Sequence, residues 1–245
     1  VTASVGDWLV VMVAANNAGA GGATAATQSA SDGAGNTYTL RGSVLIRDPG
    51  SANDGCEFAR FTCEVTSALS GGTITVNFSP NVTSKAILAY RVQPGAGETI
   101  SFFSAGNGST GSSTTQGSGS LFTGADEYVF AGNAIETNTT VTGDSDTLDG
   151  SWSTMLTAVA NTGSDLTSMT VSGQWKGPGT SLNSQNRAST TAAAKDFAGG
   201  ALVLRSVSAT TDGVGAATGA GTATAVSVAF SSGAGAATGT ATATA

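Results

Sequence analysis

Histidine is absent from the 245 residues of the chain. Its absence excludes Ser-His-Asp and Cys-His catalytic sites, and it excludes every metal site with a histidine ligand. No glycine-rich stretch ends in Gly-Lys-Ser or Gly-Lys-Thr, so no phosphate-binding loop is predicted either. The sequence therefore predicts a protein that is not an enzyme and that carries no cofactor, with calcium as the one exception considered below.

Carboxylates alone would suffice for glycoside hydrolysis, which needs two of them about 5–10 Å apart. Glu57 and Glu64 are seven residues apart in one expected strand. A strand would point them to opposite faces and separate them by more than about 20 Å. Asp126 and Glu127 stand where a strand is expected to begin, and turn acids are common there. Neither pair supports a carbohydrate-cleaving enzyme.

Charge is scarce and mostly negative, with charged residues at 10%, a net charge of −7 and a pI near 4.3. An acidic chain is repelled by phosphate backbones, and no basic patch with interleaved aromatic residues is present, so no nucleic-acid partner is predicted. The longest strongly apolar run, Trp8–Ala15, is far shorter than the roughly 20 residues of a membrane helix. No membrane span is predicted.

Only two cysteines are present, Cys56 and Cys63. Both fall in one expected strand, at positions of opposite parity, so they should face opposite sides of a sheet. A disulfide between them would be geometrically poor without a bend or bulge. The sequence alone leaves open whether they are oxidised.

Strand patterns recur at short intervals between Gly, Ser, Asn and Asp. The run Trp8–Ala14 is continuously apolar, which is typical of a central strand buried on both faces. Thr73–Ser79 alternates apolar and polar residues, and Lys85–Val92 follows with one apolar face. Further strands are expected at 37–40, 44–46, 57–65, 100–103, 127–131, 154–159, 168–175 and 201–205. About ten to twelve short strands predict an all-β fold over residues 1–207, a two-sheet antiparallel β-sandwich with jelly-roll-like character.

Two segments depart from this pattern. Residues 104–120 are nearly all Gly, Ser, Thr, Asn and Gln, and they are expected to form a long loop or a poorly ordered excursion. Residues 208–245 form a low-complexity tail in which segment 213–225 recurs as segment 233–245, with ten of thirteen positions identical. Repeats of one strand-like unit usually stack, because one unit cannot bury its own face. An oligomerising strand array is therefore favoured over a flexible tail.

Three carboxylates crowd near a glycine turn at Asp144, Asp146 and Asp149. Such hard oxygen ligands suit calcium, although the spacing does not match the helix–loop–helix calcium motif. The alternative is a solvated acidic turn.

Two tryptophans, Trp152 and Trp175, are candidates for stacking on a glycan at the rim of the sandwich. Large aromatic residues of this kind more often fill a sandwich core. Both interpretations follow from the sequence.

Several segments carry a resemblance to a known family: Gly6–Val11, Asp32–Leu40, Val65–Leu69 with Thr73–Val76, and Lys195–Arg205. They resemble β-sandwich domains of tailed-bacteriophage virion proteins, and the Gly/Ala/Thr repeats resemble tails on phage structural proteins. The resemblance implies a structural component of a virus particle, such as a capsid decoration protein, a head fibre or a tail fibre. It implies a location on the virion surface or outside the cell, with copies of itself and other virion proteins as partners.

Two other functions fit the same features. Long loops at 16–28, 104–120 and 176–191 would suit a module that recognises a receptor or a host surface glycan, on a fibre or a bacterial surface adhesin. A secreted filament subunit, whose C-terminal strand pairs with the next copy, is the third hypothesis.

Overall fold

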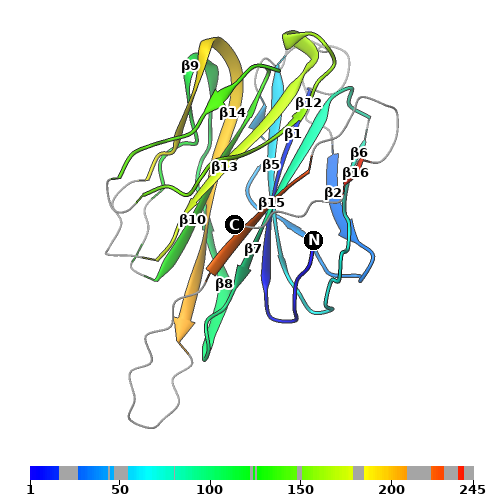
Figure 1. The fold of residues 1–245 in the computed structure, drawn as a ribbon, viewed down its shortest axis with the longest axis vertical. Helices are drawn as coiled ribbons and strands as arrows, with labels where there is room; N and C mark the ends of the chain where they lie inside the picture. The colour runs from blue at the N-terminus through cyan, green and yellow to red at the C-terminus, as the bar shows by residue number, and fades with distance from the viewer. Residues whose placement is uncertain are drawn as a thin grey trace.

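The structure is a computed structural model of the chain (Figure 1). It describes residues 1–16, 27–43, 45–46, 55–79, 81–121, 124, 126–147, 151–178, 185–208, 222–228 and 237–239. Within these ranges the fold is all-β, every strand pair is antiparallel, and the one helical element is the 3₁₀ turn Asp165–Thr167. The predicted all-β class is confirmed.

The first sheet has six strands and is built around β1. Its order is β15-β7-β1-β5-β3, and β4 also pairs with β5. The strands are β1 (Trp8–Asn16), β3 (Thr39–Leu40), β4 (Leu45–Ile46), β5 (Cys56–Glu64), β7 (Lys85–Gln93) and β15 (Thr222–Val228).

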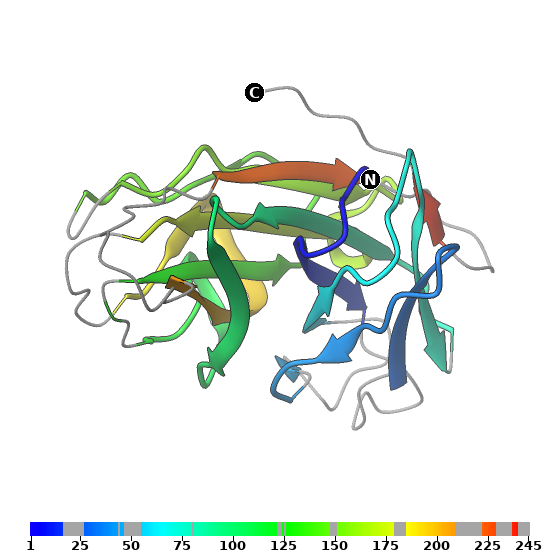
Figure 2. The same cartoon turned by 90° about the horizontal axis from the view of Figure 1, so that it is seen from below.

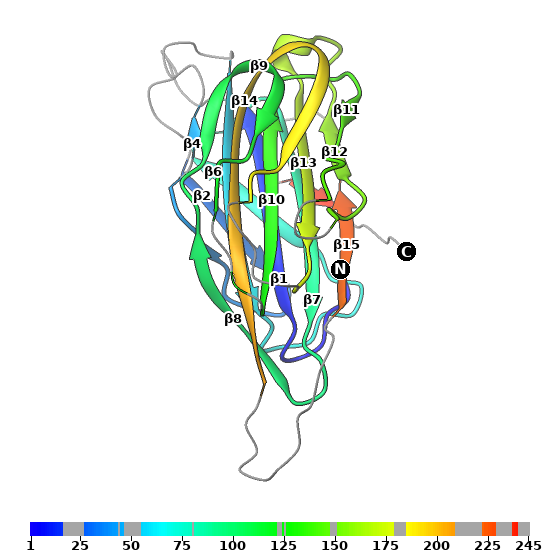
Figure 3. The same cartoon turned by 90° about the vertical axis from the view of Figure 1, so that its left-hand side faces the viewer.

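The second sheet has seven strands in the order β11-β14-β10-β13-β12, with β8 and β9 also paired to β14. The strands are β8 (Glu98–Ala105), β9 (Ser109–Gly117), β10 (Glu127–Ile135), β11 (Val141–Thr142), β12 (Leu156–Ala160), β13 (Met169–Lys176) and β14 (Ala188–Ser208). The long strand β14 runs along this sheet (Figure 3) and pairs with β9 through its first half and with β8 through its last residues.

A third, small sheet was not predicted. It consists of β16 (Ala237–Gly239), β6 (Ile74–Ser79) and β2 (Thr27–Asp32), in that order. Figure 2 shows β2 and β6 on the opposite side of β1 from β10 and β13. The first sheet is therefore the middle layer of three.

The position of β1 explains its sequence. All nine of its residues are buried. Alternate residues such as Val10 and Met12 pack in the core shared with the second sheet, whereas Leu9 and Val11 pack in the core shared with the third. A strand that faces two cores needs apolar residues at both parities. The prediction that this run is a central strand buried on both faces is confirmed.

The two cysteines follow the same alternation. Cys56 lies in the core toward the second sheet and Cys63 in the core toward the third. Both are buried and neither is in a disulfide. Burial raises the pKa of the Cys63 thiol to about 12, so it stays protonated and unreactive at neutral pH.

The expected long loop at 104–120 is wrong. The first two residues of this segment end β8 (Glu98–Ala105), and Ser109–Gly117 form β9. The strand β9 pairs with β14 along one side, which satisfies its backbone groups without help from bulky side chains. Gly111 leaves room for the ring of Phe197, whose Cε1 would lie 3.1 Å from a Cβ at that position. An edge strand with one exposed side tolerates a Ser/Thr/Gly composition that otherwise resembles a loop.

The repeat tail contributes two strands. β15 begins at the end of the first repeat, runs three residues beyond it and pairs with β7, whereas β16 lies in the second repeat and pairs with β6. Ser208 ends β14, and the rest of the tail lies outside the described residues, as do 17–26 and 179–184 of the expected recognition loops.

Candidate functional site

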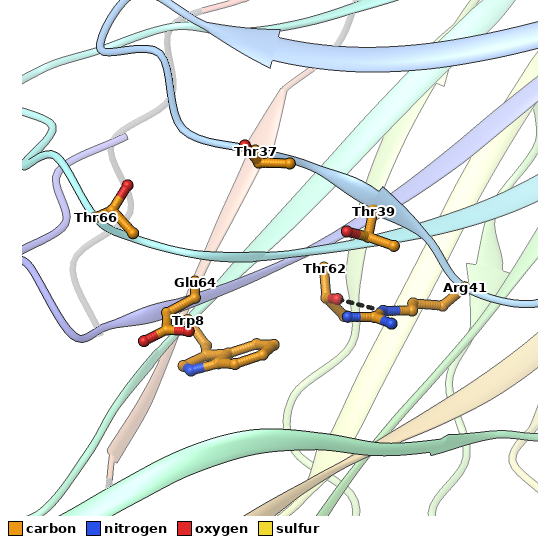
Figure 4. A pocket seen from close by; sticks show the side chains of 7 residues that line it. All are labelled: Trp8, Thr37, Thr39, Arg41, Thr62, Glu64 and Thr66. Atoms are coloured by element: carbon orange, nitrogen blue, oxygen red, sulfur yellow. Dashed lines mark hydrogen bonds between the residues drawn. The ribbon is translucent and has the colours of Figure 1, made fainter.

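A pocket of about 260 Å³ opens on the side of the sandwich at one end of the first sheet. Figure 4 shows its seven side chains, which come from the start of β1, the segment through β3, and the end of β5. They are Trp8, Thr37, Thr39, Arg41, Thr62, Glu64 and Thr66. The pocket thus combines one indole, one guanidinium, one carboxylate and four hydroxyl groups.

Strand register brings these side chains together. Trp8 lies opposite Glu64 across the β1–β5 pair, and Thr39 lies opposite Thr62 across the β3–β5 pair. Side chains directly opposite one another in adjacent strands share a face of the sheet. This is also the face that carries Phe58 toward the second sheet. The pocket is therefore a continuation of the core-facing side of the first sheet.

Arg41 is held in place at one wall of the pocket. Its Nε donates to Thr62 Oγ1 at 2.7 Å, and its Cζ lies 3.8 Å from the centroid of the Phe102 ring on β8. Burial lowers the pKa of Arg41 from its ordinary value. In Figure 4 the guanidinium points back from β3 toward the Trp8 ring. The stacking and the hydrogen bond together fix a planar cation beside an aromatic wall.

This pocket was not predicted from the sequence, although one face of β5 has a residue pattern that indicates it. Its core-facing parity runs from Cys56 and Phe58 through Arg60 to Thr62 and Glu64, so it changes from apolar to polar along one face. Arg60 and Thr62 are still buried, and Arg60 donates to Ala201 O at 2.6 Å, so the opposing sheet ceases to cover the strand only at Glu64. The pairing with the segment around Thr39 is long-range and was not visible in the sequence.

A second polar site is buried on the outer face of the second sheet. Arg187 is fully buried and donates to Gln174 Oε1 at 2.9 Å, to Ser172 Oγ at 3.2 Å and to Asn133 Oδ1. Burial lowers the pKa of Arg187 to about 10. All three acceptors are neutral. We interpret this network as structural, because its groups bond to one another rather than to an open cavity.

In the acidic turn predicted to bind calcium, carboxylate oxygens interact with donors of the protein itself. Asp144 accepts from the backbone N–H of Ala188 and of Asp146, both at 2.7 Å. Asp146 Oδ2 lies 3.6 Å from Lys176 Nζ, and Asp149 lies outside the described residues. Within the described part of the chain, no group of three or more Asp, Glu, Cys or His could hold a metal. The calcium site remains a prediction.

The two tryptophans proposed as glycan contacts lie on opposite faces of the second sheet. Trp152 is 8% exposed and packs against Val129 and Ala131 on the outer face. Trp175 is half-buried on the inner face, with its ring centroid 6.5 Å from that of Tyr128. The structure does not bring the two tryptophans together, and the glycan contact remains a prediction for each.

Glu57 and Glu64, the first carboxylate pair considered for glycoside hydrolysis, are arranged as the alternation of side chains along a strand predicted. Glu57 is fully buried and accepts from Gln28 Nε2 at 3.3 Å, whereas Glu64 is exposed at the pocket. The two therefore lie on opposite faces of β5.

No family model, curated protein or solved structure matches the chain. Among the residues that the structure describes, no helix has the length and apolar character needed to span a membrane.

Proposed function

We propose that the chain is a jelly-roll-like β-sandwich and a non-enzymatic structural protein that assembles with copies of itself through β-sheet contacts, as a surface component of a virus particle. The observation that carries the proposal is the chemistry of two outermost strands, β9 and β15. Each is paired on one side only among the described residues. Neither contains a charged residue or a proline.

An outermost strand presents a row of backbone donors and acceptors to any strand that approaches it. Proteins that must stay monomeric usually block such edges with lysine, proline or inward-pointing charges. β9 consists of Ser, Thr, Gly and a single Gln, and β15 of Ala, Thr, Val and Ser. Their composition supports pairing with another chain, because nothing in it opposes that pairing.

The repeat tail adds a second line of support. β15 and β16 come from the repeat region, and each adds to a sheet of the body at its edge. Strand addition relies on backbone hydrogen bonds, so similar repeats can occupy the same edge. We propose that in the assembly these edges receive repeat strands from a neighbouring copy as well as from the same chain.

Sedimentation velocity of the full chain over a hundredfold concentration range tests this proposal. The wild-type protein is expected to form discrete oligomers, whereas Thr114→Lys in β9 and Thr224→Lys in β15 should shift the population toward the monomer. Thr140→Lys is the matched control, because Thr140 is an exposed threonine outside the strands. A wild-type protein that is monomeric throughout, or edge variants that assemble like the control, would overturn the proposal.

The place on a virus particle is supported by the resemblance of the strand and turn segments and of the repeats to phage structural proteins. Antibodies against the body of the protein should then label intact particles at regularly spaced positions in electron micrographs. Labelling of host cells alone, with none on particles, would contradict this part of the proposal and leave the sheet-edge assembly to be judged separately.

A further inference from the structure

The core-facing side of the first sheet changes from apolar to polar toward the pocket described above. On the core-facing side, residues such as Met12 and Phe58 are apolar and fully buried. At the pocket the same face carries Thr39, Thr62 and Glu64 instead. Thr62 is still buried, but Thr39 and Glu64 are exposed, so this end of the face is open to water or to a polar ligand.

The pocket is also more rigid than an ordinary exposed surface. Trp8 is only 8% exposed and belongs to the main core, so its indole is fixed by packing. Arg41 is bonded to Thr62 and stacked on Phe102. These side chains have already lost their conformational freedom in folding, which lowers the entropic cost of binding a ligand.

The mixture of groups selects a class of ligand. Hydroxyls and a carboxylate accept hydrogen bonds from ligand hydroxyls, a guanidinium donates to ligand oxygens, and an indole offers an apolar wall for C–H groups. The one guanidinium and the one carboxylate balance, so neither an anion nor a cation is favoured. The volume of about 260 Å³ is somewhat below the 300–1,000 Å³ typical of sites for drug-sized ligands. It suits one small ring.

We propose that this pocket binds a single unit of a neutral saccharide. The exposed edge of the Trp8 indole contacts the sugar ring, while Glu64, Arg41 and the threonines around Thr39 hydrogen-bond its hydroxyls. The site is distinct from the tryptophans on the second sheet, and it does not depend on the assembly proposed above. It would give a structural protein the means to recognise a glycosylated surface.

Titration of the full ¹⁵N-labelled chain tests this inference by NMR. The probes are oligosaccharides ending in glucose, galactose, mannose or N-acetylglucosamine, with a sialic-acid-terminated trisaccharide as the charged comparison. The reporter is the indole N–H resonance of Trp8, assigned by sequential experiments. At least one neutral probe is expected to shift this resonance in a saturable manner, and the charged comparison should not.

Three variants locate the binding. Thr39→Val and Glu64→Gln change exposed side chains of the pocket, so both should fold normally, and each should weaken binding about fivefold to tenfold through the loss of one hydrogen-bonding group. Thr140→Val, which changes an exposed residue that does not line the pocket, should bind like the wild type. No saturable shift of Trp8 at tens of millimolar of any neutral probe would overturn the proposal, and so would equal affinities in all three variants.

Discussion

The strands β1 and β9 have the same length, nine residues each, and opposite character. β1 is paired on both sides, every residue is buried, and all of its side chains but Asn16 are apolar. Within the described ranges β9 pairs only with β14, and exposed residues alternate along most of it with partly buried ones. The difference shows that two kinds of strand share this fold. One is stabilised by side-chain burial, and the other is held mainly by backbone hydrogen bonds, which leaves its outer row available to another chain.

The largest expected effect is on the β1 side of this comparison. Met12 is fully buried and packs in the core between the first and second sheets. Met12→Ala should lower the free energy of unfolding by about 2–5 kcal/mol, because it loses apolar burial and leaves a cavity. Thr114→Ala in β9 should change it by less than about 0.5 kcal/mol. Urea unfolding measures both, and similar effects of the two changes would contradict the contrast.

The next largest effect on the free energy of unfolding is expected at the buried polar network around Arg187. Arg187→Met should destabilise the protein by about 3 kcal/mol, because it deprives Asn133, Gln174 and Ser172 of a donor in a buried site. Arg187→Lys should recover little of this loss, since one ammonium cannot reach all three acceptors as a planar fork does. Chemical unfolding of both variants provides the test. A methionine variant as stable as the wild type would show that the network contributes nothing.

A smaller effect on the free energy of unfolding is expected from two tyrosines whose hydroxyl groups differ in hydrogen bonding. The Tyr90 hydroxyl is buried without a hydrogen-bond partner and lies beside Gly173, whereas the Tyr38 hydroxyl donates to Asp32 Oδ2 at 2.9 Å. Tyr90→Phe should leave stability unchanged or raise it by up to about 1 kcal/mol, because it removes an unpaired polar atom. Tyr38→Phe should lower stability by about 1 kcal/mol. Thermal and urea unfolding of the pair check the prediction, and a marked loss in Tyr90→Phe would refute it.

The smallest expected effect is on the way the free energy of unfolding depends on pH. The backbone N–H of Asn138, at 3.0 Å, and the ammonium of Lys195 lower the pKa of the Asp165 carboxyl from its ordinary value. Because the pKa is lower in the folded state, the stabilisation is complete above the unfolded pKa of about 3.9 and is lost as the pH falls through the folded value. Asp165→Asn should therefore flatten the decline in stability at acid pH. Unfolding curves from neutral to strongly acid pH would reveal it, and an unaltered slope would rule it out.

The contrast between β1 and β9 also explains what the sequence could predict. The continuous run from Trp8 and the alternation at Ile74, Val76 and Phe78 specify strands directly, and both strands are present. β9 was missed because an edge strand of Ser, Thr and Gly has the composition of a loop. Alternation in β6 predicted its buried face but not that it would form a third sheet. Such pairings are set by long-range contacts.

The candidate sites show the same limit. The pocket depends on Thr39 lying opposite Thr62, and the buried network depends on Arg187 reaching over β13 and β10. Neither arrangement has a local sequence pattern. Conversely, the tryptophans and the acidic turn were conspicuous in the sequence, but the structure gives Trp152 and Asp144 partners within the protein itself.

Hydrogen–deuterium exchange of the full chain at low and high concentration tests the central claim most directly. If the outer row of β9 pairs with another copy, its amides should gain protection as concentration rises, while those of β1 stay fully protected at every concentration. Exchange in β9 that is identical in dilute and concentrated samples would contradict the account.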